Sequence, residues 1–182
     1  MLTNMDDHQL IAQFLTTDKQ SAFNELVRRY QSPIRQFLRR LSAGDHALAD
    51  DIAQETFLKM YSSLTSFRGE AKLSTWLHRI AYHCFLRANE NNAKYQFSEE
   101  VKAPEPEALN NFEADSDIAL EQLMKHLSVE ERLMLTLNFS AGMSHGEIAD
   151  VTHYPLGTIK SHIARGKHKL EMLLQAEEKQ YA

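Results

Sequence analysis

The chain has 182 residues, 43% of them hydrophobic, and a formal net charge of −5, which suits one or two small domains with packed cores. No segment approaches the roughly 18 apolar residues that a membrane span needs, and Asp6 and Asp7 interrupt the N-terminus, so we expect neither membrane insertion nor a signal peptide. The one cysteine, Cys84, excludes an internal disulfide and is typical of a reducing compartment, so we predict a cytoplasmic protein.

The N-terminal part, residues 1–97, shows helical spacing of its apolar residues throughout. Asp18 is a plausible N-cap of the second helix, and Ser32-Pro33 is expected to restart or kink the chain. Asp45 is expected to cap a long third helix, and Ser74 a last one. No segment shows the alternation of a strand, so the predicted fold class is all-α.

Two exposed helix faces in this part could bind a partner. The long helix is expected to bury Phe57 and Tyr61 and to expose Asp51, Gln54, Glu55 and Lys59; from spacing alone, a solvated face is the preferred interpretation. The last helix mixes cations with aromatic rings, which suits unstacked single-stranded bases. The alternative, equally supported, is that Trp76 belongs to the core and the rest is surface. These residues are Trp76, Arg79, Tyr82, His83 and Arg87.

An acidic segment follows at residues 98–117, with one Lys, seven acidic residues and two prolines, Pro104 and Pro106. This composition predicts a flexible, self-repelling linker. A loop packed on one domain is the alternative. The linker divides the chain into an N-terminal domain, 1–97, and a C-terminal domain, 118–182.

Two short helices joined by a turn are predicted in the C-terminal domain. Ser144 and Glu147 form a capping box at the start of the first helix, and Pro155 suits the first turn of the second. The core-facing positions of the second helix are Ile159, Ile163, Gly166 and Leu170. This is the arrangement that lays a helix in the DNA major groove, so we predict a helix-turn-helix in a four-helix domain.

The open face of that second helix is basic. No acidic residue occurs between Asp150 and Glu171, although the chain as a whole is acidic. The cations in that interval are Lys160, Arg165, Lys167 and Lys169. Such a stretch is an electrostatic footprint for phosphates. An amphipathic helix with a solvated cationic face is the alternative.

Three motifs in this order resemble those of the bacterial sigma factors of the small extracytoplasmic-function group. The segment DIAQETFL at 51–58 resembles their polymerase-binding motif. FRGE at 67–70, followed by WLHRIA at 76–81, resembles their promoter-melting segment, and PLGTIKS at 155–161 resembles their recognition-helix signature. The resemblance extends from about Ser21 to Leu174.

The resemblance implies a protein without catalytic chemistry that binds core RNA polymerase, brings it to promoter DNA and helps to open the duplex. It also implies an anti-sigma factor as a partner. The implied polymerase contacts are Asp51, Gln54, Glu55, Leu58 and Lys59. The implied contacts to the promoter element near −10 are Arg68, Gly69, Trp76, Arg79, Tyr82, His83 and Arg87. The implied contacts to the element near −35 are Leu156, Gly157, Thr158, Lys160, Ser161, His162, Arg165 and Lys169.

Four positions depart from the pattern of that family. His83 stands where Asn is common, and His162 replaces a usual Arg. His153 stands where a turn glycine is usual, in a conformation that His tolerates less readily. Gly166 replaces a usual Ala, at a helix-propensity cost of about 1 kcal/mol, and close helix packing is expected to explain it.

Other classes of protein account for less of the chain. A helix-turn-helix regulator that does not bind polymerase would explain the C-terminal domain alone, and a protein-binding adaptor would not explain the basic helix. The nine His are scattered, and no nucleophile–base pair, zinc spacing or glycine-rich phosphate loop occurs. We therefore expect no enzyme activity, cofactor, metal or small-molecule substrate.

Overall fold

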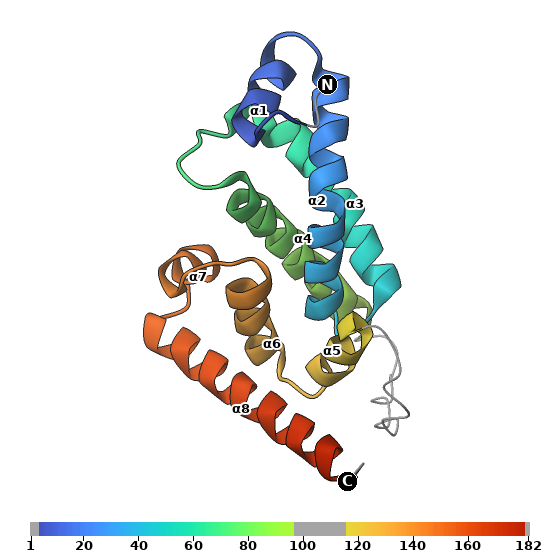
Figure 1. Cartoon of the computed structure of the whole chain (residues 1–182), viewed down its shortest axis with the longest axis vertical. Coiled ribbons are helices and arrows are strands. Elements are labelled where there is room, and N and C mark those ends of the chain that lie inside the picture. The colour runs from blue at the N-terminus through green and yellow to red at the C-terminus, as the bar shows by residue number, and fades with distance from the viewer. Residues whose placement is uncertain (1–3, 97–115, 181–182) are drawn as a thin grey trace.

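The computed structural model describes residues 4–96 and 116–180, and all regular structure in these residues is helical, as predicted (Figure 1). The first unit contains α1 (Asp7–Thr16), α2 (Lys19–Leu41), α3 (His46–Ser63), a 3-10 turn (Leu64–Ser66) and α4 (Leu73–Gln96). The second contains α5 (Ser116–Met124), α6 (Val129–Leu135), the π-helical segment η3 (Thr136–Ser140), α7 (His145–Thr152) and α8 (Leu156–Gln180). The predicted linker, 98–117, lies outside the described residues except for its last two.

Local capping signals fix the starts of several helices. The Asp18 carboxylate accepts a hydrogen bond from the Ser21 amide, and Asp45 accepts one from the Leu48 amide, both at 3.0 Å, as predicted. The cap predicted at Ser74 is wrong. α4 begins at Leu73, and the amide of Trp76 bonds to the Lys72 carbonyl (3.1 Å), so Ser74 lies within the first turn.

The chain restart predicted as one outcome at Ser32-Pro33 is also wrong, because α2 runs unbroken through Pro33, and the kink predicted as the other outcome stays a prediction. Pro33 lies on the exposed side of the helix. The carbonyl that loses its helical hydrogen bond there can therefore bind water instead. Residues on both sides of Pro33, such as Leu26 and Phe37, are each 0% exposed, so both halves of α2 are anchored in the core.

The first unit is organised around α2, which packs against α1, α3 and α4. Cys84 is buried there as a small apolar group. The largest fully buried side chains of this core are Leu10, Phe14, Leu26, Ile34, Phe37, Leu38, Leu41, Met60, Leu64 and Leu77. Among the helices of the described residues, none is both long and apolar enough to cross a bilayer.

Glu25 is a buried charged group of α2, 7% exposed, that pairs with Arg28 (2.7 Å) and Arg29 (3.2 Å). The hydrogen bond from Arg28 lowers the pKa of Glu25 from 4.5 to about 2, against the opposing effect of burial. A carboxylate whose pKa falls on folding stabilises the fold above its unfolded pKa, and this stabilisation is lost as the pH falls through the folded pKa.

We therefore expect Glu25→Gln to be less stable than the wild type at pH 7, with a difference that shrinks between pH 4.5 and about pH 2. Urea denaturation at a series of pH values measures this. A difference that stays constant with pH would mean that the loss comes from packing and not from the charge.

In the second unit, α8 crosses α6 at Gly166. A Cβ atom at this position would lie 2.7 Å from Cδ1 and 3.3 Å from Cγ of Leu135, which is only 3% exposed. The close helix packing expected at Gly166 is thus confirmed. A Cβ atom at Gly157, in the first turn of the same helix, would meet no heavy atom of the described chain within 4 Å.

The pair Gly166→Ala and Gly157→Ala separates crowding from helix propensity. Both changes gain propensity, by up to about 1 kcal/mol. Only Gly166→Ala must displace Leu135, and overpacking of this kind costs about 1–3 kcal/mol. We expect Gly166→Ala to be the less stable of the two by at least about 1 kcal/mol in chemical denaturation. Equal stabilities would mean that Leu135 moves aside freely.

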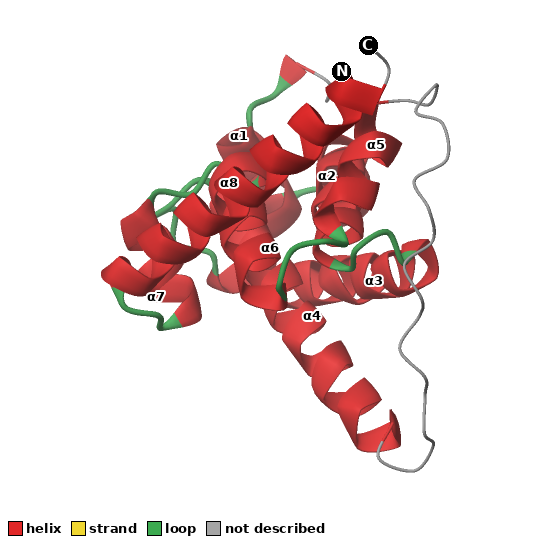
Figure 2. Cartoon of the chain, turned by 90° about the horizontal axis from the view of Figure 1, so that it is seen from below, coloured by secondary structure: helices red, strands yellow, loops and turns green. Residues whose placement is uncertain are grey.

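The two units contact each other mainly through α2, which packs against α5, α6 and η3 of the second unit (Figure 2). Arg132 on α6 donates from Nε to the Leu41 carbonyl (2.9 Å), closing the last turn of α2. Arg40 donates to Ser140 Oγ (2.8 Å). On the other side of the same contact, His46 Nε2 lies 2.6 Å from a carboxylate oxygen on α5. The second unit is therefore docked directly on the first.

Candidate polymerase and nucleic-acid interfaces

The exposed side of α3 carries the residues expected to contact polymerase. Asp51, Gln54 and Leu58 face solvent, and Leu58 is 72% exposed. Glu55 and Lys59, one turn apart, are partly buried and form an ion pair of 2.9 Å. The exposed Leu58 therefore lies on the same side of α3 as the exposed acidic and amide groups Asp51 and Gln54.

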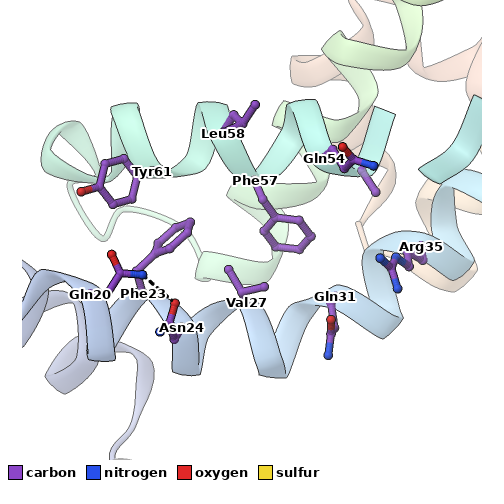
Figure 3. A pocket seen from close by; sticks show the side chains of 11 residues that line it. Gln20, Phe23, Asn24, Val27, Gln31, Arg35, Gln54, Phe57, Leu58 and Tyr61 are labelled. Atoms are coloured by element: carbon purple, nitrogen blue, oxygen red, sulfur yellow. Dashed lines mark hydrogen bonds between the residues drawn. The ribbon is translucent and has the colours of Figure 1, made fainter. Parts of the chain in front are cut away.

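A groove of about 570 Å³ runs between α2 and this face of α3 (Figure 3). Its floor is apolar, with Phe23, Val27 and Phe57, and Gln54 and Leu58 of the α3 face lie on its α3 side. The amides that line the α2 side are Gln20, Asn24 and Gln31.

The sequence did not predict this groove, because its aromatic residues have the spacing of core positions. Tyr61, predicted to be buried, is 43% exposed and packs edge-on against Phe23 (4.9 Å between ring centroids). The regular amide positions along the same side of α2 were the available signal.

The loop before α4 and α4 itself, as far as Arg87, carry the residues expected near −10. Arg68 and Gly69 are exposed, and Gly69 has a φ of 72°, which favours glycine. Trp76 is half-buried, with its ring 5.2 Å from that of Phe67. Trp76 packs against the core and is also partly exposed. The core interpretation and the surface interpretation of this residue are therefore each correct in part.

Arg79, His83 and Arg87 follow one another at intervals of four residues on the exposed side of α4. Burial, and then the nearby charge of Arg79, lower the pKa of His83. A neutral imidazole offers one hydrogen-bond donor and one acceptor, so it can pair with either kind of group on the edge of a base. Arg87 bonds to Glu55 of α3 (3.3 Å), so this surface adjoins the α3 face.

Tyr82 differs from its neighbours because it is 4% exposed. Burial raises the pKa of its hydroxyl, with a smaller effect from Tyr154 of the second unit. A DNA contact by Tyr82 would require this side chain to be uncovered, and its expected role stays a prediction.

The helix-turn-helix forms as predicted. Ser144 and Glu147 make a reciprocal capping box, with bonds of 2.8 and 3.2 Å. His153 ends α7 in the left-handed conformation (φ 61°, ψ 18°), the turn position where glycine is usual in the resembling family. Pro155 precedes α8, and its carbonyl accepts the Ile159 amide (3.1 Å). Hydrogen bonds at the end of α7 and at the start of α8 therefore define the turn. Its backbone strain lies at His153, which adopts the left-handed conformation.

α8 buries Ile159, Ile163 and Gly166 and turns its polar side outward. Leu156, the first residue of the helix, is 50% exposed although it is apolar. The other residues expected near −35 are exposed or half-buried on this helix: Gly157, Thr158, Lys160, Ser161, His162, Arg165 and Lys169. The basic face predicted from the sequence is thus open in the structure.

A carboxylate that the sequence did not indicate lies beneath this basic face. Glu131 of α6, 4% exposed, bonds to Lys169 Nζ (2.7 Å), and its other oxygen lies 3.9 Å from Arg165 Nε. Arg165 Nη2 in turn donates to His162 Nδ1 (3.0 Å). Lys167 lies over the exposed Phe139 ring, 4.6 Å from its centroid.

Comparison with known proteins identifies the family. Residues 26–94 match Sigma-70 region 2, and residues 117–170 match Sigma-70, region 4. The RNA polymerase sigma-H factor of Pseudomonas aeruginosa is 32% identical over 189 residues, covering 96% of this chain and 97% of the relative. The ECF RNA polymerase sigma-E factor of Haemophilus influenzae is 31% identical over 193 residues, covering 96% and 98%. The chain belongs to the extracytoplasmic-function (ECF) sigma factors.

Solved structures agree with this ECF sigma factor in fold. The sigma factor RpoE of Bartonella quintana, in complex with the anti-sigma factor NepR, has a TM-score of 0.67 at 25% identity, covering 84% of this chain and 96% of that one. CnrH in complex with the cytosolic domain of CnrY has a TM-score of 0.64 at 23% identity, covering 93% and 97%.

The two family matches contain different candidate interfaces of this ECF sigma factor. The region 2 match contains α3 and nearly all of α4, and the region 4 match contains α6, α7 and the basic half of α8. Within the described part of the chain, no group of three or more His, Cys, Asp or Glu side chains could hold a metal ion.

Proposed function

We propose that this ECF sigma factor binds core RNA polymerase through the α3 face and the adjoining groove. The observation that carries this proposal is the strongly exposed Leu58 beside an apolar groove of about 570 Å³, flanked by Asp51 and Gln54. Burial of Leu58 and of the groove floor would supply affinity, and the acidic and amide groups would select a basic helical partner.

The surface of α4 would bind the promoter near −10. Its cations Arg79 and Arg87 suit the phosphates of a displaced strand, and the half-exposed Trp76 offers part of an aromatic face to an unstacked base. Since Arg87 also bonds to Glu55, DNA binding and polymerase binding would take place on adjoining surfaces of the same unit.

The second unit would bind the element near −35 with α8 in the major groove. Arg165 and Lys160 are candidates for guanine edges or phosphates, and the exposed Leu156 for a thymine methyl group. Each unit alone offers a small footprint, and tethering the two raises their joint affinity through effective concentration.

The protein would act in the cytoplasm and without enzymatic chemistry of its own.

The solved relatives named above are complexes with NepR and with the cytosolic domain of CnrY. By analogy, an anti-sigma factor that covers the polymerase- and DNA-binding surfaces would hold this protein inactive.

Run-off transcription with purified core polymerase tests the proposal. We expect the chain to direct initiation at a subset of promoters that core polymerase alone does not use. A regulator that acts without binding polymerase would give no such initiation and would instead bind duplex DNA by itself. That result would refute the proposal and leave only the helix-turn-helix function.

A further inference from the structure

We propose that Glu131 is a positioning residue for −35 recognition: its carboxylate holds Lys169 against α6 and orients the guanidinium of Arg165 toward a base edge. The inference deepens the proposed function and rests on it. It concerns a residue of α6 that does not belong to the helix-turn-helix.

Glu131 is held in place by its own helix. It forms the capping box of α6 with Ser128, accepting the Ser128 amide at 3.0 Å and donating its own amide to the Ser128 hydroxyl at 3.2 Å. The close approach of α8 at Gly166 also confines it, since a Cβ atom there would lie 3.4 Å from the Glu131 Cβ. The carboxylate therefore has a fixed position beneath α8.

Glu131 is also charged at neutral pH. Burial raises the pKa of this carboxyl, but the hydrogen bonds from Lys169 and from the Ser128 amide outweigh it and hold the pKa below its usual value. A buried carboxylate of this kind requires its cationic partner. If Lys169 left it to contact a phosphate, an uncompensated charge would stay behind.

Lys169 therefore supports the structure instead of clamping DNA. Its ammonium group, 2.7 Å from Glu131, ties the middle of α8 to the start of α6. This gives Lys169 a role different from the DNA contact expected from the sequence.

Arg165 has polar neighbours on two sides. Its Nε faces Glu131 at 3.9 Å, and its Nη2 donates to His162 at 3.0 Å. A guanidinium that is ordered before binding loses less side-chain freedom when it meets a guanine, and its planar fork keeps the orientation that discriminates between bases. The Glu131 charge thus acts on sequence preference through Arg165.

Glu131→Gln tests the proposal because it keeps the side-chain volume and the capping box but removes the charge. Glu130→Gln is the matched control: it makes the same change of net charge on the same turn, and within the described residues its interaction with α8 is the electrostatic attraction to His162, without a hydrogen bond. Each variant is assayed as holoenzyme on two templates that differ only in the −35 bases. The assay measures the ratio of initiation on the two templates, and promoter binding is measured at a series of salt concentrations.

We expect Glu131→Gln to reduce the preference for the cognate template about 5- to 10-fold, because Arg165 loses its orientation. The slope of log binding constant against log salt concentration should become steeper by about one, because Lys169 is released and can contact the phosphates. Glu130→Gln should keep the wild-type preference. A well-folded Glu131→Gln with wild-type preference and slope would overturn the proposal.

Lys169→Gln keeps the test decisive if Glu131→Gln fails to fold. A lysine that supports the structure leaves the salt slope unchanged when it is replaced, whereas a phosphate contact lowers the slope by about one. The lower slope would overturn the inference. If wild-type holoenzyme itself shows no preference between the templates, the proposed function fails, and the inference fails with it.

Discussion

Replacing Asp51 and Gln54 together by alanine should abolish retention of the chain on core RNA polymerase without changing its helix content. Both side chains are exposed on α3, so their removal leaves the core untouched. At a desolvated interface, truncation of such polar anchors costs about 2 kcal/mol each, so we expect affinity to fall by about 1,000-fold for the two together. Pull-down with purified core polymerase measures retention, and circular dichroism measures helix content.

The matched control is the pair Asp150→Ala and Gln175→Ala, which removes the same two side-chain types from exposed positions of the second unit. This control should keep full retention on polymerase. If the Asp51 and Gln54 variant is also retained, the exposed side of α3 is only a solvated face.

Arg165→Ala should reduce transcription from a cognate promoter and relax the base preference at one or two −35 positions. The reason is the loss of a bidentate contact to a base edge, which is worth about 1–3 kcal/mol of discrimination. Run-off transcription on a set of templates with single substitutions at −35 measures both effects.

Lys167→Ala serves as the control for charge, because it removes an equal charge two residues along α8, where the ammonium lies over the Phe139 ring. We expect Lys167→Ala to leave the base preference unchanged. If Arg165→Ala weakens every template equally, Arg165 contacts a phosphate and does not recognise a base.

The helix starts and the helix-turn-helix could be predicted because they depend on short-range signals. The caps at Asp18, Asp45 and Ser144 each involve an amide three residues away. The continuity of α2 at Pro33 and the start of α4 before Ser74 could not be predicted from local preference. At Pro33 residues on both sides are buried, and its exposed position makes the missing hydrogen bond tolerable.

The parts of the candidate site that the sequence did not reveal depend on contacts between distant segments. The Glu131 carboxylate meets Lys169 at a separation of 38 residues, and no spacing rule connects them. The groove beside α3 is lined from both α2 and α3, and Phe23 and Tyr61, which touch across it, have the spacing of core residues. The exposed sides of α3, α4 and α8 could be predicted, because helical periodicity alone determines which residues share a face.

The hydrogen bond from Arg132 to the Leu41 carbonyl has a consequence for promoter binding. Elements near −10 and −35 are about 25 base pairs apart, or about 85 Å of B-form DNA. α8, with 25 residues, is about 37 Å long. If the two units bind these elements as proposed, we expect the Arg132–Leu41 hydrogen bond to break before both elements are held at once, so that only a separated form binds the whole promoter. Apparent promoter affinity then scales with the population of that form, and a partner that binds it preferentially increases DNA occupancy without touching a base.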